Sequence, residues 1–184
     1  LDGTDITITN QLQPFKGYWL CCSDPMIMKL KENENNEEFN YDWSIEITAS
    51  ALDSVAIGDI IKIGMDINAS NDYIFGEDTQ DIPVVQVADS YLDLYMRDNN
   101  NLKYWKDTKA MITPDQSQIW NINGYSANSV SDVRLNWTMD ELDEAFDITM
   151  FISGNSINMR EETSVVVSIG NSITVLVGND PLSP

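Results

Sequence analysis

The chain has 184 residues, of which thirty are Asp or Glu, ten are Lys or Arg and none is His, so its formal net charge is −20. Nucleic-acid binding depends on clustered Lys and Arg that contact phosphates, and this balance argues against it. The lack of His removes the commonest general base and the imidazole ligand of metal sites. The acidity instead favours hard cations such as Ca²⁺, which bind carboxylate, amide and backbone oxygens.

The length and composition predict one folded domain over residues 1–178, followed by a linker-like tail at 179–184. An apolar content of 42% is ordinary for a globular protein, despite the charge. Apolar runs such as Ile173–Val177 are too short to cross a bilayer. The chain begins at Leu1 without Met or an apolar leader, so we expect a processed form whose targeting signal has been removed.

Alternation of apolar and polar residues predicts β-strands along the whole chain. The first strand is expected at Asp5–Gln11, where Ile6 and Ile8 alternate with Thr7 and Thr9. Turn signals such as Asn123-Gly124 separate the strands. Roughly nine to eleven strands are expected, which fits an all-β fold, a two-sheet antiparallel β-sandwich of jelly-roll or Ig-like type. Further strands are predicted at Trp43–Ala49, Leu92–Arg97, Val133–Thr138, Phe146–Ser153 and Ile173–Val177, and a short helical turn at Asp140–Ala145.

Two adjacent cysteines, Cys21 and Cys22, are the only thiols in the chain. Neighbours on a strand point to opposite faces, which favours one buried and one partly exposed side chain. An intermolecular disulfide is the alternative. A Cys nucleophile is not expected, because no His can activate it.

The segment Asp66–Asp81 is the best candidate for a metal site. Its first, third, fifth and twelfth positions carry oxygen side chains, as in a calcium loop. However, Asn71 stands where an EF-hand needs Gly, so an irregular calcium loop is the hypothesis and a solvated acidic loop the alternative. The predicted ligands are Asp66, Asn68, Asp72, Glu77, Asp78 and Asp81.

Aromatic residues form a second candidate site, because flat rings beside amides suit sugar rings. Trp43 and Trp137 lie on alternating apolar positions and are assigned to the core. Trp105 follows an Asn-rich turn and is expected to be the more exposed candidate. Packing in the core or at an edge is the alternative reading. The predicted carbohydrate-binding residues are Tyr104, Trp105, Trp120 and Tyr125.

Self-assembly is the third possibility. The predicted N-terminal strand, with Asp5, Ile6, Thr7, Ile8 and Thr9, suits addition to the sheet edge of another subunit. The same strand could pair within its own domain instead. The acidity would keep subunits apart until Ca²⁺ or salt screened it, or it reflects halophilic adaptation or colloidal protection.

Asn68 and Asn136 each begin a glycosylation sequon, and only Asn68 has a loop setting that favours modification. No phosphate loop, nucleophile elbow or His-based metal motif is present. A glycosidase pair among the thirty carboxylates is formally possible, but no motif singles one out. The sequence therefore predicts a protein that is not an enzyme.

Several local patterns resemble a known class of module. The segment Pro14–Trp19 resembles the P-x-x-GYW segment of large secreted bacterial proteins. Together with several further local patterns, this segment is similar to the β-sandwich modules that precede C-terminal sorting regions in secreted proteins of Bacteroidetes-like bacteria. Asn158 departs from that pattern, where Asp is commoner, and so does Ile82-Pro83, where a Pro pair is commoner. The supporting patterns are Trp43–Ile47, Ile63–Met65, the acidic loop ending at Pro83, Leu135–Trp137, Asn158–Arg160 and Gly178.

The resemblance implies an extracellular or cell-surface location and a non-catalytic role. We therefore expect a structural or adhesive subunit of a surface layer or filament, stabilised by Ca²⁺ and self-associating. Its partners would be copies of itself or other surface proteins. The alternative is a carbohydrate-binding module of a secreted multidomain protein, with a glycan as ligand. If neither holds, the chain is a passive spacer.

Overall fold

The computed structural model describes residues 42–52, 56, 58–74, 77–81, 90–97, 101–127, 131–140 and 142–178. The predicted strand at Asp5–Gln11, the pair Cys21 and Cys22 and the tail at 179–184 lie outside these residues. The described residues form strands and turns and contain no helix, which confirms the all-β prediction. The strands are β1 (Trp43–Ala51), β2 (Asp59–Asp66), β3 (Thr79–Gln80), β4 (Leu92–Arg97), β5 (Lys103–Ala110), β6 (Ser117–Ser126), β7 (Asp132–Met139), β8 (Ile148–Ile152), β9 (Asn155–Asn158), β10 (Ser164–Ser168) and β11 (Ile173–Gly178).

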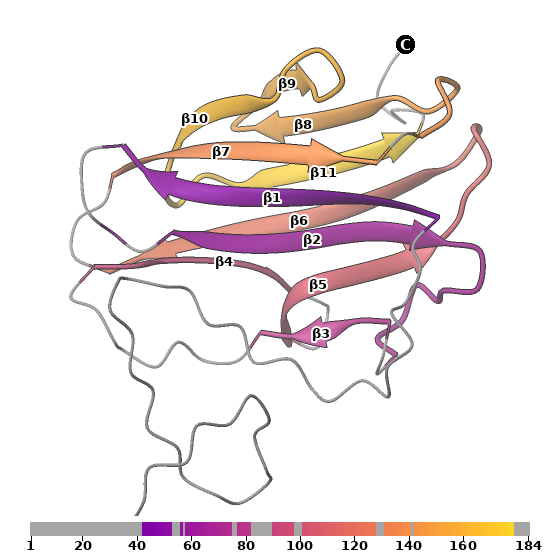
Figure 1. The fold of residues 1–184 in the computed structure, drawn as a ribbon, viewed down its shortest axis with the longest axis horizontal. Coiled ribbons are helices and arrows are strands. Elements are labelled where there is room, and N and C mark those ends of the chain that lie inside the picture. The colour runs from indigo at the N-terminus through magenta and orange to yellow at the C-terminus, as the bar shows by residue number, and fades with distance from the viewer. Residues whose placement is uncertain are drawn as a thin grey trace, which may run out of the picture.

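Hydrogen bonds join these strands into one sheet in the order β10-β7-β1-β2-β5-β4-β6-β11-β8-β9, with β3 paired to β5 (Figure 1). All pairs among the described strands are antiparallel except β2 and β5, which are parallel. The prediction of two separate antiparallel sheets is therefore not confirmed. The structure is a curled mixed sheet, similar to half of a barrel.

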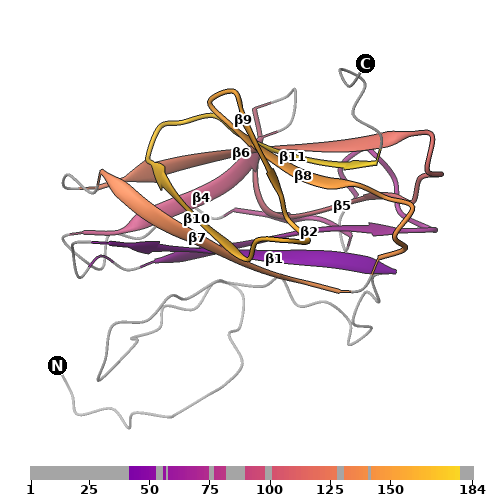
Figure 2. The same cartoon turned by 90° about the horizontal axis from the view of Figure 1, so that it is seen from above.

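The curl places distant parts of the sheet across from one another. Figure 2 shows β1, β2 and β7 on one side and β6, β8 and β11 on the other. The core between them contains large side chains from both groups, including Trp43 and Ile47 of β1 and Trp120 of β6, each at most 1% exposed. Burial of these apolar surfaces is the main force that holds the curl.

Period-two alternation explains why these segments are strands. In β1, Trp43, Ile45 and Ile47 are fully buried, whereas Glu46 points to solvent. The predicted core positions of β4, β7, β8 and β11 are buried as well, and Trp137 is 4% exposed. The prediction that Trp43 and Trp137 belong to the core is confirmed.

Among the described residues, turns and loops connect the strands. Ser153 and Gly154 both have positive φ, as the two-residue turn of the β8–β9 hairpin requires. The predicted helical turn at Asp140–Ala145 is not seen in the described residues, which form a non-helical turn around residues 144–146. This loop is held by hydrogen bonds from the Arg160 guanidinium, so its shape depends on a contact that local sequence does not reveal.

Candidate functional site

The acidic loop begins at the end of β2, and its side chains mostly bind the backbone of the loop itself. Asp66 is buried, and its Oδ1 accepts the N–H of Asn68 at 2.7 Å. Glu77 Oε2 accepts the N–H of Ser70 at 2.9 Å. These bonds fold the loop back on itself, because short acidic side chains readily cap nearby backbone N–H groups.

Asp78 joins the loop to the sheet. Its carboxylate is 4% exposed and accepts the N–H of Ile74 at 2.9 Å and the N–H of Thr108 at 2.8 Å. Burial raises the pKa of Asp78 to about 6, although both backbone hydrogen bonds act to lower it. Thr108 also donates its hydroxyl to the Glu77 carbonyl at 3.0 Å.

Asn71 occupies the loop position that would be Gly in an EF-hand, and the structure gives it a definite role. Its Oδ1 accepts the N–H of Ala110 at 3.2 Å and the Nε2 of Gln118 at 2.8 Å. Asn71 therefore ties the loop to β5 and β6. The sequence reveals the departure of Asn71 from the calcium-loop pattern but not these contacts.

The six predicted calcium ligands are not brought together as one set. Asn68 and Asp72 are exposed, whereas Asp66 and Asp78 are buried in different hydrogen-bonding arrangements. Asp81 donates its backbone N–H to the Lys103 carbonyl at 2.9 Å. Among the residues that the structure describes, no group of three or more Cys, His, Asp or Glu side chains is arranged to hold a metal ion. Calcium binding by the loop stays a prediction.

Three of the four predicted carbohydrate-binding aromatics are buried. Trp120 is 1% exposed, Tyr104 is 4% exposed and Trp105, which was expected to be the more exposed candidate, is only 9% exposed. Tyr125 is 51% exposed, and its ring centroid lies 6.1 Å from that of Tyr91. Trp105 is buried because neighbouring residues on both faces of β5 are covered by the rest of the protein. The polar turn that precedes Trp105 in the sequence does not indicate this burial.

The open edge of β10 is the clearest candidate for an interaction surface. β10 lies at one end of the sheet, and no strand of the described chain pairs with its outer side (Figure 1). Register with β7 directs the N–H groups of Ser164, Val166 and Ser168 outward, because the bonds from Trp137 N to Thr163 O and from Ile169 N to Ser131 O fix the inward positions. The Val166 side chain is 49% exposed.

β10 also lacks the usual protection of an edge strand. Its sequence, Ser-Val-Val-Val-Ser, carries no charge and no Pro, and its register with β7 contains no bulge. Edge strands of soluble domains commonly use one of these devices to prevent pairing with another chain. The sequence alone does not identify β10 as an edge strand, because periodicity predicts that a strand exists but not whether it lies at an edge.

Comparison of the chain with known protein families, curated proteins and solved structures finds no match. The resemblance to secreted bacterial β-sandwich modules therefore stays a prediction. Within the described residues, no helix is long and apolar enough to span a membrane.

Proposed function

We propose that this chain is a non-catalytic extracellular structural or adhesive subunit that self-associates by strand addition at the β10 edge. The observation that supports the proposal is the unprotected, uncharged edge of β10, with three outward N–H groups. An edge of this kind is a template for a further strand, since each added strand satisfies open backbone groups.

The segment Asp5–Gln11 is the proposed incoming strand. Ile and Thr alternate at positions 6–9, and this part of the segment carries no charge. Pairing of two uncharged strands avoids the repulsion that a charge of −20 on each copy would otherwise impose. Screening by salt or Ca²⁺ would therefore promote the association.

Amide hydrogen exchange of the full chain tests this proposal at the residues concerned. At low protein concentration the outward amides of Ser164 and Val166 should exchange quickly, because no ladder bond protects them. At high concentration their protection should rise at least about tenfold, whereas the amides of Val165 and Val167, which face β7, should stay protected throughout. Equal exchange of the outward amides at all concentrations would reject the β10 edge as the interface.

A further inference from the structure

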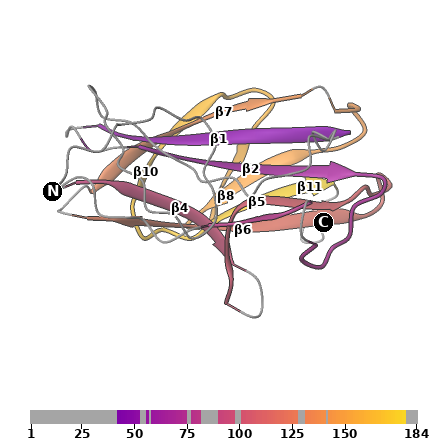
Figure 3. The same ribbon diagram turned by 60° about the horizontal axis from the view of Figure 1, so that its bottom comes forward.

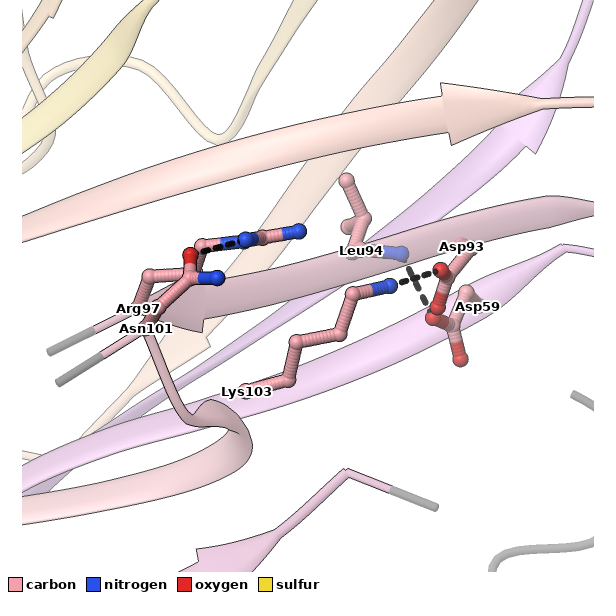
Figure 4. Close-up of polar contacts among 6 residues, drawn as sticks. All are labelled: Asp59, Asp93, Leu94, Arg97, Asn101 and Lys103. Atoms are coloured by element: carbon pink, nitrogen blue, oxygen red, sulfur yellow. Dashed lines mark hydrogen bonds and ion pairs between the residues drawn. The ribbon is translucent and has the colours of Figure 1, made fainter. Parts of the chain in front are cut away.

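The sheet splays where β2, β4 and β5 meet. β5 pairs with the second half of β2 and with the last two residues of β4, and β2 and β4 also contact each other. In this gap the Asp59 Oδ2 accepts the N–H of Leu94 at 2.7 Å (Figure 4). A side-chain oxygen therefore takes the place of a ladder acceptor between β2 and β4. Figure 3 shows β5 running beside β2.

Asp93, which directly precedes Leu94 in the chain, carries a second carboxylate, and Figure 4 draws it toward the same gap. Each residue is 6% exposed. Asp93 Oδ2 accepts the Lys103 Nζ at 2.9 Å, but Asp93 Oδ1 is buried and has no hydrogen-bond partner. Such an atom in a folded protein requires an explanation, and a bound ion or water is the usual one, because a buried oxygen without a partner is costly.

Lys103 is a replaceable neighbour of this carboxylate. Its side chain is 34% exposed, against 7% for Asp93, and its Nζ lies 3.8 Å from the centre of the Tyr95 ring. The Lys103 side chain is therefore the more exposed partner of this ion pair. Lys103 therefore competes for Asp93 with any cation that enters.

We propose that the carboxylates of Asp59 and Asp93 bind a hard divalent cation of the Ca²⁺ type between β2 and β4. Such ions take carboxylate and backbone oxygens and water as ligands, which suits two carboxylates at a splayed backbone. The ion would supply the partner that Asp93 Oδ1 lacks and would link two strands where no ladder joins them. This site is separate from the acidic loop Asp66–Asp81 and does not depend on the proposed assembly.

Terbium luminescence of the metal-free full chain tests the site, because the Lys103 ammonium contacts both the Tyr95 ring and Asp93, which places a sensitising ring near the site. We expect a Tb³⁺ signal that Ca²⁺ displaces in about 150 mM KCl, which screens weak binding to surface carboxylates. Asp93→Asn should weaken Tb³⁺ affinity at least about tenfold, since it removes a ligand charge. Asp147→Asn, which removes an exposed carboxylate that belongs to neither candidate metal site, is the matched control and should leave the affinity unchanged.

Lys103→Met gives a test with the opposite sign. Removal of the competing ammonium should tighten Tb³⁺ binding, whereas a plain ion pair between Lys103 and Asp93 predicts no gain of affinity. Circular dichroism of each variant checks the fold, and Lys103→Met keeps the proposal testable if Asp93→Asn does not fold. The proposal is overturned if Asp93→Asn binds as the wild type does, if Asp147→Asn loses the signal, or if Lys103→Met does not bind Tb³⁺ more tightly.

Discussion

Asp78 shows, at the scale of single residues, how a buried charge couples the fold to pH. The pKa of its carboxyl is raised from 3.8 to about 6 by burial, so the folded state binds a proton more tightly than the unfolded chain. The stability that this proton contributes is full below about pH 4 and is lost as the pH rises through 6.

Urea unfolding at a series of pH values tests this coupling. Between about pH 4 and 6, the free energy of unfolding should fall more in the wild type than in Asp78→Asn, by on the order of 1 kcal/mol. Asp72→Asn, at an exposed position, controls for the general effect of removing one negative charge. Parallel curves for the wild type and Asp78→Asn would show that Asp78 does not titrate in this range.

Substitution of two glycines with positive φ allows the cost of backbone strain to be compared with the cost of a steric clash. Gly178 has φ +98° and a Cβ there would lie 2.1 Å from the Gln116 carbonyl oxygen, whereas Gly170 has φ +95° and open space around it. Gly170→Ala should therefore cost about 1 kcal/mol for the left-handed conformation alone. Gly178→Ala should cost about 3 kcal/mol or more, because the backbone must also shift. Thermal unfolding measures both, and equal costs would contradict the close approach at Gly178.

At the scale of elements, the turn after β9 is fixed by one arginine. The Nη2 of Arg160 donates to the carbonyls of Leu142, Asp143 and Phe146, at 3.1, 2.8 and 3.0 Å. The Trp137 Nε1 donates to Met159 O at 3.0 Å. This turn leads into β10, so the guanidinium helps to set the position of the proposed assembly edge.

Arg160→Lys keeps the charge but loses the planar donors, so it should destabilise the fold by about 1–2 kcal/mol. It should also speed proteolysis within residues 142–146, which Arg160 holds. Arg134→Lys, at an exposed position of β7, is the matched control and should change neither quantity. If Arg160→Lys and Arg134→Lys have equal stability, the loop does not depend on the several N–H donors of the Arg160 guanidinium.

The sequence predicted the elements better than their pairing. Alternation located β1, β4, β7, β8 and β11, because each strand has one face on the core. It could not predict the parallel pairing of β2 with β5, since the two strands lie about forty residues apart and the local sequence of neither strand indicates its partner. The same limit hid the hydrogen bond from the Leu94 N–H to the Asp59 carboxylate, because that bond joins β2 to β4 across many residues of sequence.

At the scale of the whole molecule, the charge and the open sheet act in opposite directions. A net charge of −20 keeps copies apart, whereas the unpaired edge of β10 favours contact. Composition alone predicted the repulsion and the attraction to cations. The position of the attractive edge required the strand order, which depends on long-range contacts rather than on local pattern.

The strongest test of the proposed assembly is the light-scattering mass of the full chain over a range of protein concentrations, with and without added NaCl or Ca²⁺ at equal ionic strength. Val166→Pro removes an outward backbone N–H without breaking a hydrogen bond to β7. Val166→Thr is the control, because it keeps the backbone N–H and has a side chain of similar size. We predict that the mass of the wild type and of Val166→Thr grows with protein concentration. Val166→Pro should stay monomeric with an unchanged fold, and deletion of Leu1–Asn10 should have the same effect. Growth of Val166→Pro equal to that of the wild type, or a wild type that stays monomeric under every condition, would contradict assembly at the β10 edge.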